Sequence, residues 1–313
     1  MKSIILLLTF SLVSIFQLQA QEVSIIVGGS NIRGTLEVPK SDHPVDVVLL
    51  IAGSGPTDRD GNTPPVLGKN NSLKMLSELF SKNGIASLRY DKRGVGASDK
   101  VIEKDLSFDM YVNDAVEWIK FLKNDKRFSK IIIAGHSEGS LIGMIAGTKI
   151  GIDKYISLCG AGHPAYSIIA EQLKNVGLSK EELEQNDKIL DSLRNGLNIT
   201  NIPNNQIFKS LYRTSVQKYI IAWFKYDPAT VISELNIPVL IIGGTTDIQI
   251  DVKEAEILSK ASPKSELVIV EDMNHILKEV ATKDRALNFS SYSNPDLALS
   301  DQLCKSLISF IKK

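Results

Sequence analysis

The sequence predicts an α/β fold with a mostly parallel central sheet, flanking helices and a helical cap insertion. Three observations predict it. Short apolar runs bounded by turn residues, which are typical of strands buried on both faces, recur along most of the chain. Helical patterns lie between most of these runs, and this alternation implies parallel βαβ units. One internal stretch, residues 164–227, breaks the alternation because it contains helical patterns only.

The predicted strands start with a pair that is joined by a turn around Gly28 and Gly29, and continue as apolar runs. The runs cover residues 23–27, 32–38, 47–51, 85–88, 130–134, 155–158, 238–242 and 266–270. Apolar residues at helical spacing predict the helices between them. These cover residues 72–83, 108–123, 141–150, 253–260 and 297–311.

The stretch without strands contains three helical patterns, over residues 165–176, 180–195 and 206–224, which are split by Gly177, Gly196 and Pro203. An insertion at this point would lie over the carboxyl ends of the strands, where open α/β sheets bind ligands. We therefore expect a cap at 164–227, between two core segments at 21–163 and 228–313. The alternative is a separate helical domain that is unrelated to the binding crevice.

Composition limits the possible partners and cofactors. The 313 residues allow one large α/β domain with a modest insertion. Lys and Arg together number 36, as do Asp and Glu, so the sequence lacks the basic excess expected of a nucleic-acid binder. The two cysteines, Cys159 and Cys304, have no metal-ligand spacing with the four histidines, and we expect no metal. Export would permit a disulfide, but their apolar surroundings favour two buried thiols.

The first 20 residues have the pattern of a signal peptide. Met1-Lys2 supplies a positive start, residues 4–16 are nearly all apolar, and Ala20 ends a short polar stretch. The apolar core is short for a membrane span, which needs about 20 residues. We expect cleavage after Ala20, export to the periplasm or medium, and no stable membrane anchor afterwards. The alternative is an uncleaved anchor.

A serine lies in a turn whose context predicts a nucleophile. Gly135-His136-Ser137-Glu138-Gly139 directly follows one predicted strand and directly precedes a predicted helix. A nucleophile elbow needs this context, with small residues on both sides of the strained serine. A structural glycine turn is the alternative.

Two later loops provide candidates for the base and the acid. His275 follows the last predicted strand, and the chain order serine, acid, histidine favours it over His163. Asp247 follows the strand at 238–242 and precedes a helix, so it is the preferred acid. Its alternative role is a helix cap, and Asp251 is the nearest competitor because Glu271 and Asp272 lie too close to His275 in sequence.

Backbone N–H groups in two segments could stabilise a developing oxyanion. One is that of Glu138, which follows the serine. The second belongs to the loop after the strand at 47–51, where Ser54 is the preferred donor and Gly55 the alternative.

Over most of its length the chain resembles the α/β-hydrolase superfamily. Residues 53–61 (Gly-Ser-Gly-Pro-Thr-Asp-Arg-Asp-Gly) resemble bacterial carboxylesterases of the serine-aminopeptidase-like branch, as does Met273-Asn274-His275. Residues 91–98 (Asp-Lys-Arg-Gly-Val-Gly-Ala-Ser) are similar to a loop found across the superfamily. The chain departs from the common His-Gly start of the oxyanion loop, because Ala52 precedes Gly53. The resemblance implies an α/β-hydrolase fold and a Ser137–His275–Asp247 triad.

These features predict a carboxylesterase that acts on small-molecule esters of short or medium acyl length without a cofactor. A peptidase or amidase would use the same triad, and a non-catalytic ligand-binding relative is a third possibility. The charges at Asp58, Arg59 and Asp60 could contact substrate, but such clusters more often tie down a loop through ion pairs and Asx turns.

Overall fold

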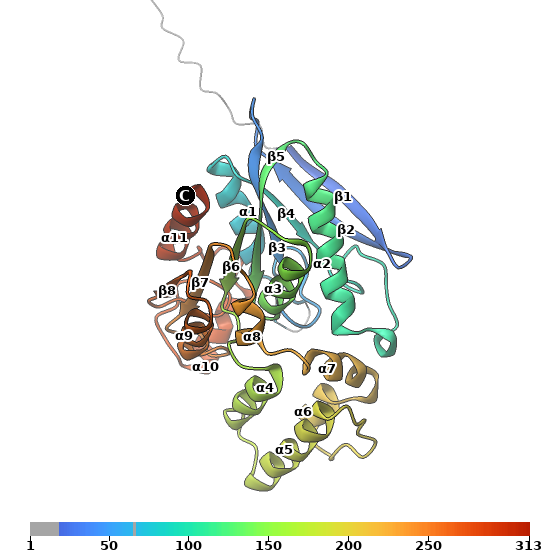
Figure 1. Ribbon diagram of the computed structural model, residues 1–313. Coiled ribbons are helices and arrows are strands. Elements are labelled where there is room, and N and C mark those ends of the chain that lie inside the picture. Colours follow the sequence, from blue (N-terminus) through green and yellow to red (C-terminus); the bar gives the residue numbers. More distant parts are fainter. Residues whose placement is uncertain (1–18, 65–66) are drawn as a thin grey trace, which may run out of the picture.

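The computed structural model describes residues 19–64 and 67–313 (Figure 1). Of the predicted signal peptide, residues 1–18 lie outside this part, and Gln19 and Ala20 are the first two residues of strand β1. An eight-stranded sheet forms the centre, with the order β1-β2-β4-β3-β5-β6-β7-β8. The strands are β1 (Gln19–Val27), β2 (Ser30–Val38), β3 (Val45–Ile51), β4 (Ala86–Tyr90), β5 (Phe128–His136), β6 (Lys154–Leu158), β7 (Val239–Gly244) and β8 (Ser265–Val270).

The sheet is antiparallel at one edge and parallel elsewhere. β1 pairs antiparallel with β2, and β2 pairs antiparallel with β4, whereas every later pairing is parallel. Gly28 and Gly29 form the two-residue turn between β1 and β2 at φ 56° and 81°. Positive φ at both positions is the requirement of a type I′ hairpin turn, so this two-residue loop is shorter than the predicted one. The predicted α/β fold is confirmed.

Helices cover both faces of the sheet. α1 (Ser72–Lys82) and α11 (Asp301–Lys312) pack on one face over apolar side chains such as Leu50 and Ile132. α2 (Phe108–Lys123), α3 (Glu138–Ile150), α8 (Pro228–Ser233) and α9 (Val252–Ala261) belong to the opposite core. The central strands are therefore buried on both sides, which explains their continuous apolar runs.

Four inserted helices lie together at one end of the molecule (Figure 1). They are α4 (Ala165–Lys174), α5 (Lys180–Arg194), α6 (Gln206–Leu211) and α7 (Gln217–Trp223). The single helix predicted over residues 206–224 is wrong, because a short 3-10 turn, Thr214–Val216, separates α6 from α7. At this break Arg213 and Ser215 bind Glu103, and such polar contacts interrupt the helical ladder.

The prediction missed two short helices, α8 and α10 (Arg285–Ser290). α8 has a recognisable start, since Asp227 caps it and Pro228 occupies its first turn. The last helix begins at Asp301 and not at residue 297. Two 3-10 turns, Glu103–Asp105 and Ser291–Ser293, complete the elements. Within residues 19–64 and 67–313, no helix is long and apolar enough to cross a membrane.

Candidate active site

Ser137 lies at the sharp turn between β5 and α3. Its backbone adopts φ 54° and ψ −121°, a strained conformation for a residue with a side chain. The flanking glycines are required by close backbone contacts. A Cβ at Gly135 would lie 2.6 Å from the Cα of Ser140, and one at Gly139 would lie 2.6 Å from the carbonyl oxygen of Ala52. The glycines therefore permit the turn that presents Ser137 at the end of the sheet.

Asp247 and His275 are joined by a buried hydrogen bond of 2.7 Å between Asp247 Oδ2 and His275 Nδ1. The other oxygen of Asp247 accepts hydrogen bonds from the backbone N–H groups of Gln249 and Ile250, at 2.7 and 2.9 Å. These contacts fix the carboxylate and leave Nε2 as the free nitrogen of the imidazole. The competing candidates have other partners: Asp251 caps α9, and His163 binds Glu254.

A tight loop after β8 holds His275. Asn274 is fully buried; its Oδ1 accepts from the backbone N–H of Lys278, and its Nδ2 donates to Ser291 Oγ at 2.8 Å. Lys278 is also buried and donates to the carbonyl oxygen of Leu297, and burial lowers the pKa of its ammonium to about 8. Neither supporting residue was predicted from the sequence. Only the neighbouring His275 could have drawn attention to them.

Ser137 and His275 line the same cavity of about 260 Å³. In the part of the chain that the structure describes, no hydrogen bond joins Ser137 Oγ to the His275 ring. Catalytic hydrogen bonds are often long without a bound substrate, so this geometry is compatible with proton transfer between the two residues. The arrangement can support nucleophilic chemistry, with a serine hydroxyl, a histidine and a carboxylate in the required order.

Two residues with candidate backbone donors lie beside Ser137. Glu138 is the first residue of α3, so its N–H has no acceptor within the helix. Ser54 lines the 260 Å³ cavity and also a second cavity, of about 90 Å³, that Ser137 lines as well. Gly55 lines the first cavity but not the second, and its φ of 70° allows the loop to turn.

The two cavities differ in their lining. The 90 Å³ cavity runs under the inserted helices and is lined mainly by apolar residues, including Leu141, Ile168 and Trp223. Glu138, His163, Gln172 and Gln249 also line it. The 260 Å³ cavity contains His275 and several hydroxyl and amide groups, including those of Asn70 and Tyr292. Ser137 thus lines both a smaller, mainly apolar space and a larger space with more hydroxyl and amide groups.

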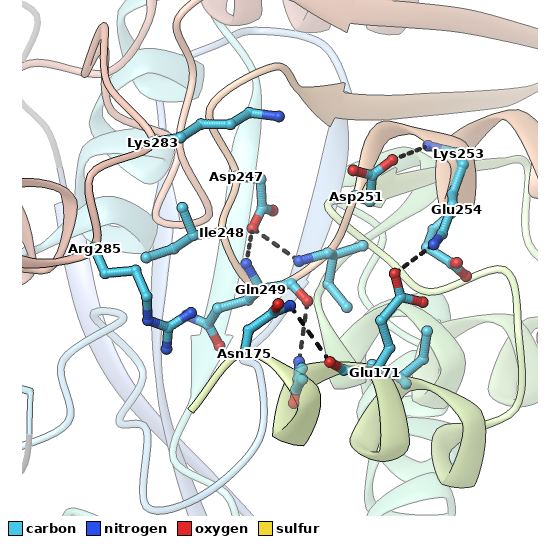
Figure 2. A pocket seen from close by; sticks show the side chains of 13 residues that line it. Glu171, Asn175, Asp247, Ile248, Gln249, Asp251, Lys253, Glu254, Lys283 and Arg285 are labelled. Carbon is cyan, nitrogen blue, oxygen red and sulfur yellow. Dashed lines mark hydrogen bonds and ion pairs between the residues drawn. The ribbon is translucent and has the colours of Figure 1, made fainter. Parts of the chain in front are cut away.

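A third cavity, of about 400 Å³, lies between α4 and the loop that carries Asp247. Figure 2 shows Glu171 and Asn175 on the α4 side and Lys283 and Arg285 on another side. Gln249 lines all three cavities, and its side-chain amide donates to the hydroxyl of Tyr292 at 2.9 Å. Gln249 therefore lies where the three cavities adjoin one another.

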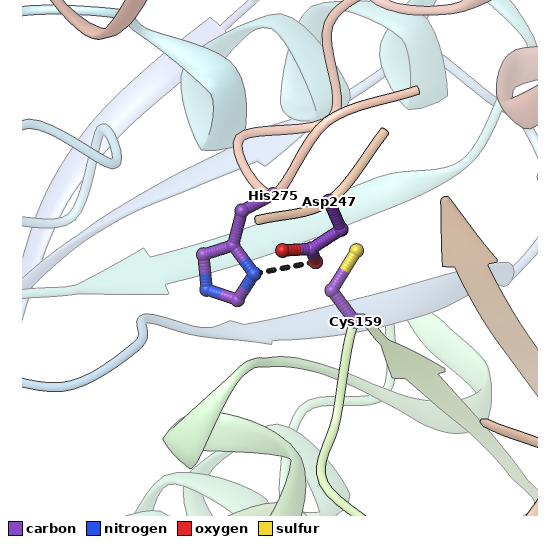
Figure 3. Close-up of side chains that lie close together, drawn as sticks. All are labelled: Cys159, Asp247 and His275. Atoms are coloured by element: carbon purple, nitrogen blue, oxygen red, sulfur yellow. Dashed lines mark hydrogen bonds and ion pairs between the residues drawn. The ribbon is translucent and has the colours of Figure 1, made fainter. Parts of the chain in front are cut away.

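Cys159 lies beside Asp247 (Figure 3). One ligand atom each from Cys159, Asp247 and His275 lies within 4.8 Å of the others, so the set has the composition of a metal site. Burial, together with the Asp247 charge, raises the pKa of the thiol well above its usual value. A metal needs the thiolate, so a neutral thiol packed against Asp247 fits this site better. Cys159 and Cys304 are both free, and Cys304 is only half-buried, contrary to the expectation.

The charged cluster near Ser54 ties down its loop. Asp58 Oδ1 accepts from the backbone N–H groups of Asp60 and Asn62, which is an Asx turn. Arg59 forms a buried ion pair with Asp91 at 2.9 Å. The predicted structural role of this cluster is confirmed, and the side chains of Asp58, Arg59 and Asp60 line neither cavity beside Ser137.

Eight mostly parallel strands, a strained serine between a strand and a helix, and a buried Asp–His pair together define an α/β-hydrolase. Comparison with known families gives the branch. The profile of the family described as serine aminopeptidase, S33, matches residues 70–279, and the chain belongs to this family of hydrolases. The predicted superfamily and branch are therefore confirmed.

Known relatives agree with this assignment. The chain is 26% identical over 298 residues to the esterase EstD of Thermotoga maritima. The matched region covers 92% of this chain and 68% of the relative. Its fold is similar to that of Est1E from Butyrivibrio proteoclasticus with bound ferulic acid, at a TM-score of 0.63 and 20% identity, covering 93% of this chain and all of the other. The fold is also similar to that of the Pyrococcus furiosus esterase Pf2001, at a TM-score of 0.59 and 14% identity. This match covers 94% of this chain and 91% of the other.

Proposed function

We propose that the protein is a serine carboxylic ester hydrolase. The observation that carries the proposal is the 2.7 Å hydrogen bond between Asp247 and His275, whose imidazole lines the same cavity as the strained Ser137. The esterase relative at 26% identity supports an ester substrate. Ser137 is the nucleophile, His275 the general base and Asp247 the acid that orients it.

The reaction proceeds through an acyl-enzyme. His275 Nε2 takes the Ser137 proton as Oγ attacks the ester carbonyl, and the resulting oxyanion lies against the N–H groups of Glu138 and Ser54. His275 then protonates the departing alcohol oxygen. Water repeats the sequence, releasing the carboxylic acid and restoring the Ser137 hydroxyl.

The two cavities give each half of the substrate a place. His275 must reach the leaving oxygen, so the alcohol occupies the 260 Å³ cavity that His275 lines. The acyl chain then extends into the 90 Å³ cavity under the inserted helices, which act as a cap. Because this cavity is small and mainly apolar, short unbranched acyl groups are favoured within the short-to-medium range.

Purified protein and Ser137→Ala test this function with a series of nitrophenyl esters, aminoacyl amides and a fluorophosphonate probe. We expect probe labelling and ester hydrolysis by the wild type, and neither by Ser137→Ala. Faster turnover of the amides than of the esters would favour a peptidase or amidase. Absence of labelling would favour a non-catalytic relative.

We also propose export, on the signal-like pattern of residues 1–20. Cleavage after Ala20 would leave residues 21–27 to pair with β2. Mass spectrometry of protein expressed from the full gene should show Gln21 as the first residue in the periplasmic or culture fraction. Retention of Met1 would contradict the proposal.

A further inference from the structure

A buried lysine lies directly behind the two candidate oxyanion donors. Lys92 follows β4, and its side chain is 1% exposed. Its ammonium donates to the carbonyl oxygen of Gly53 and lies 3.4 Å from Glu138 Oε2. It also lies 5.1 Å from the centre of the Tyr111 ring. A buried ammonium is costly unless it is paired and hydrogen-bonded, so these contacts define a built site.

The contact with Gly53 determines the direction of one donor. The carbonyl of Gly53 and the N–H of Ser54 belong to the same peptide unit, which is planar and trans, so the two groups point in opposite directions. With the oxygen held by Lys92, the N–H of Ser54 points away from Lys92. Among the described residues, this N–H has no acceptor, and Ser54 lines both cavities beside Ser137.

The same ammonium also reaches the segment of the second donor. The Glu138 side chain is 2% exposed, and its carboxylate lies beside Lys92. Glu138 is also the first residue of α3, so its backbone N–H is one of the two candidate donors. Its other oxygen accepts a hydrogen bond from the hydroxyl of Tyr219 in α7. Lys92 thus links the loop of Ser54 to the turn of Ser137, and Tyr219 connects this link to the inserted helices.

Charge adds to the effect of geometry. A cationic donor on the Gly53 oxygen polarises the peptide and makes its N–H a stronger donor, because hydrogen bonds in a chain reinforce one another. The Glu138 carboxylate pairs with the ammonium, which lowers the cost of burying both charges. Burial lowers the pKa of Lys92, and the neighbouring Glu138 opposes this effect.

We propose that Lys92 is a positioning residue for the oxyanion hole: it orients the 53–54 peptide so that Ser54, and not Gly55, supplies the second donor, and Glu138 and Tyr219 hold Lys92 in place. This inference rests on the proposed ester hydrolysis by Ser137.

The preference of the enzyme for an ester over the matching thionoester tests this role, because a loss of stability alone would not change that preference. The thionoester sulfur is a poor acceptor, so an intact oxyanion hole favours an ester over the matching thionoester. The ratio of the two kcat/KM values does not depend on the fraction of folded enzyme. In Lys92→Met we expect this ratio to fall by about tenfold or more, since losing an oxyanion donor costs about 10² to 10³ in rate.

Lys154→Met is the matched control. Lys154 is also a buried lysine that donates to backbone carbonyls, those of Phe310 and Ile311, at the opposite end of the sheet. The Lys154→Met variant should be less stable than the wild type, and its ester-to-thionoester ratio of kcat/KM should equal the wild-type ratio. Tyr219→Phe should reduce the ratio by a smaller factor, whereas Tyr212→Phe, which removes another hydroxyl from the inserted helices, should not.

Lys92→Met leaves the Glu138 carboxylate buried without its cation and can impair folding. The double variant Lys92→Met/Glu138→Gln removes both charges and should fold, yet still show the reduced ratio. A wild-type ratio in either folded variant overturns the role of Lys92. Ester hydrolysis that persists in Ser137→Ala instead contradicts the proposed function, so the two failures are distinguishable.

Discussion

The His136 ring donates a hydrogen bond from Nε2 to the backbone carbonyl oxygen of His275, at 2.7 Å. A carbonyl oxygen can only accept, so Nε2 of His136 carries the proton. The two rings lie 4.9 Å apart at 50°. The residue before Ser137 therefore supports the loop of His275, the proposed general base, and holds this loop against the turn that carries Ser137.

This contact predicts an acid-sensitive stability. Burial, with the charge of nearby His275 as a smaller cause, lowers the pKa of His136 to about 4. The folded protein therefore keeps His136 neutral where the unfolded chain, with a pKa near 6.5, binds a proton. Stability from this group is fully present above about pH 6.5 and is lost as the pH falls toward 4. At pH 5 the loss should be about 2 kcal/mol.

Urea unfolding at pH 7.5 and pH 5 measures this loss. For each protein, the quantity to compare is the difference between its unfolding free energies at the two pH values. His136→Asn should show a change smaller by about 2 kcal/mol than the wild type. His43→Asn, which removes an exposed histidine, should behave as the wild type does. An equal change in all three proteins would show that His136 does not titrate with folding.

The fold could be predicted because its strands are buried on both faces and bounded by turns. The turn around Ser137 was recognisable for a similar reason, since close backbone contacts require Gly135 and Gly139. Asp247 and His275 were located from chain order, and they meet at 2.7 Å. These features are all encoded in short local patterns.

The supporting contacts could not be predicted, because they join distant parts of the chain. Lys92 reaches Glu138 across 46 positions, and Tyr219 reaches it across 81. In the sequence, Lys92 is one of many lysines, and its burial depends on contacts with Gly53, Tyr111 and Glu138 from three other segments of the chain. The break between α6 and α7 was missed for a related reason, since it depends on Glu103 from outside the inserted helices.

The size of the acyl cavity predicts a shift in chain-length preference when Trp223 is removed. Trp223 lines the 90 Å³ cavity, so Trp223→Ala opens space under the inserted helices. We expect the ratio of kcat/KM for hexanoate over acetate to rise about tenfold, in line with the small energies per methylene in such pockets. Nitrophenyl esters of increasing acyl length measure it.

Tyr226→Ala is the control for this variant. Both Trp223 and Tyr226 pack against Phe108, with ring centres 6.0 and 5.6 Å away, but Tyr226 does not line the cavity. It should leave the chain-length profile unchanged. If both variants shifted the profile equally, loosened packing around Phe108 would explain the effect, and the acyl assignment would be wrong.

The orientation of His275 predicts a large loss of activity in Asp247→Asn. The amide can still accept from Gln249 and Ile250, so the loop should persist, but its NH₂ group would face His275 Nδ1 and impose the wrong tautomer. We expect kcat to fall about 10³-fold or more with little change in the melting temperature. Asp251→Asn, in which asparagine still caps α9, should retain wild-type activity; a comparable loss there would favour Asp251 as the acid.

Asn274 should matter for catalysis as well as for stability. Asn274→Ala removes the partners of the Lys278 N–H and the Ser291 hydroxyl in a fully buried loop, which should cost about 2 kcal/mol. The loop carries His275, and a displacement of 1 Å at a catalytic group can lower a rate by about 10². We therefore expect kcat of the folded variant to fall at least about tenfold with KM little changed.

Asn186→Ala separates this effect from general destabilisation. Asn186 is equally buried, and its side chain accepts from Tyr212, but it lies in α5, away from the histidine loop. Both variants should unfold at lower urea concentration than the wild type, and only Asn274→Ala should lose turnover per folded molecule, as measured by titration with the phosphonate probe. Equal turnover in the two variants would mean that the Asn274 contacts stabilise the loop without setting the position of His275.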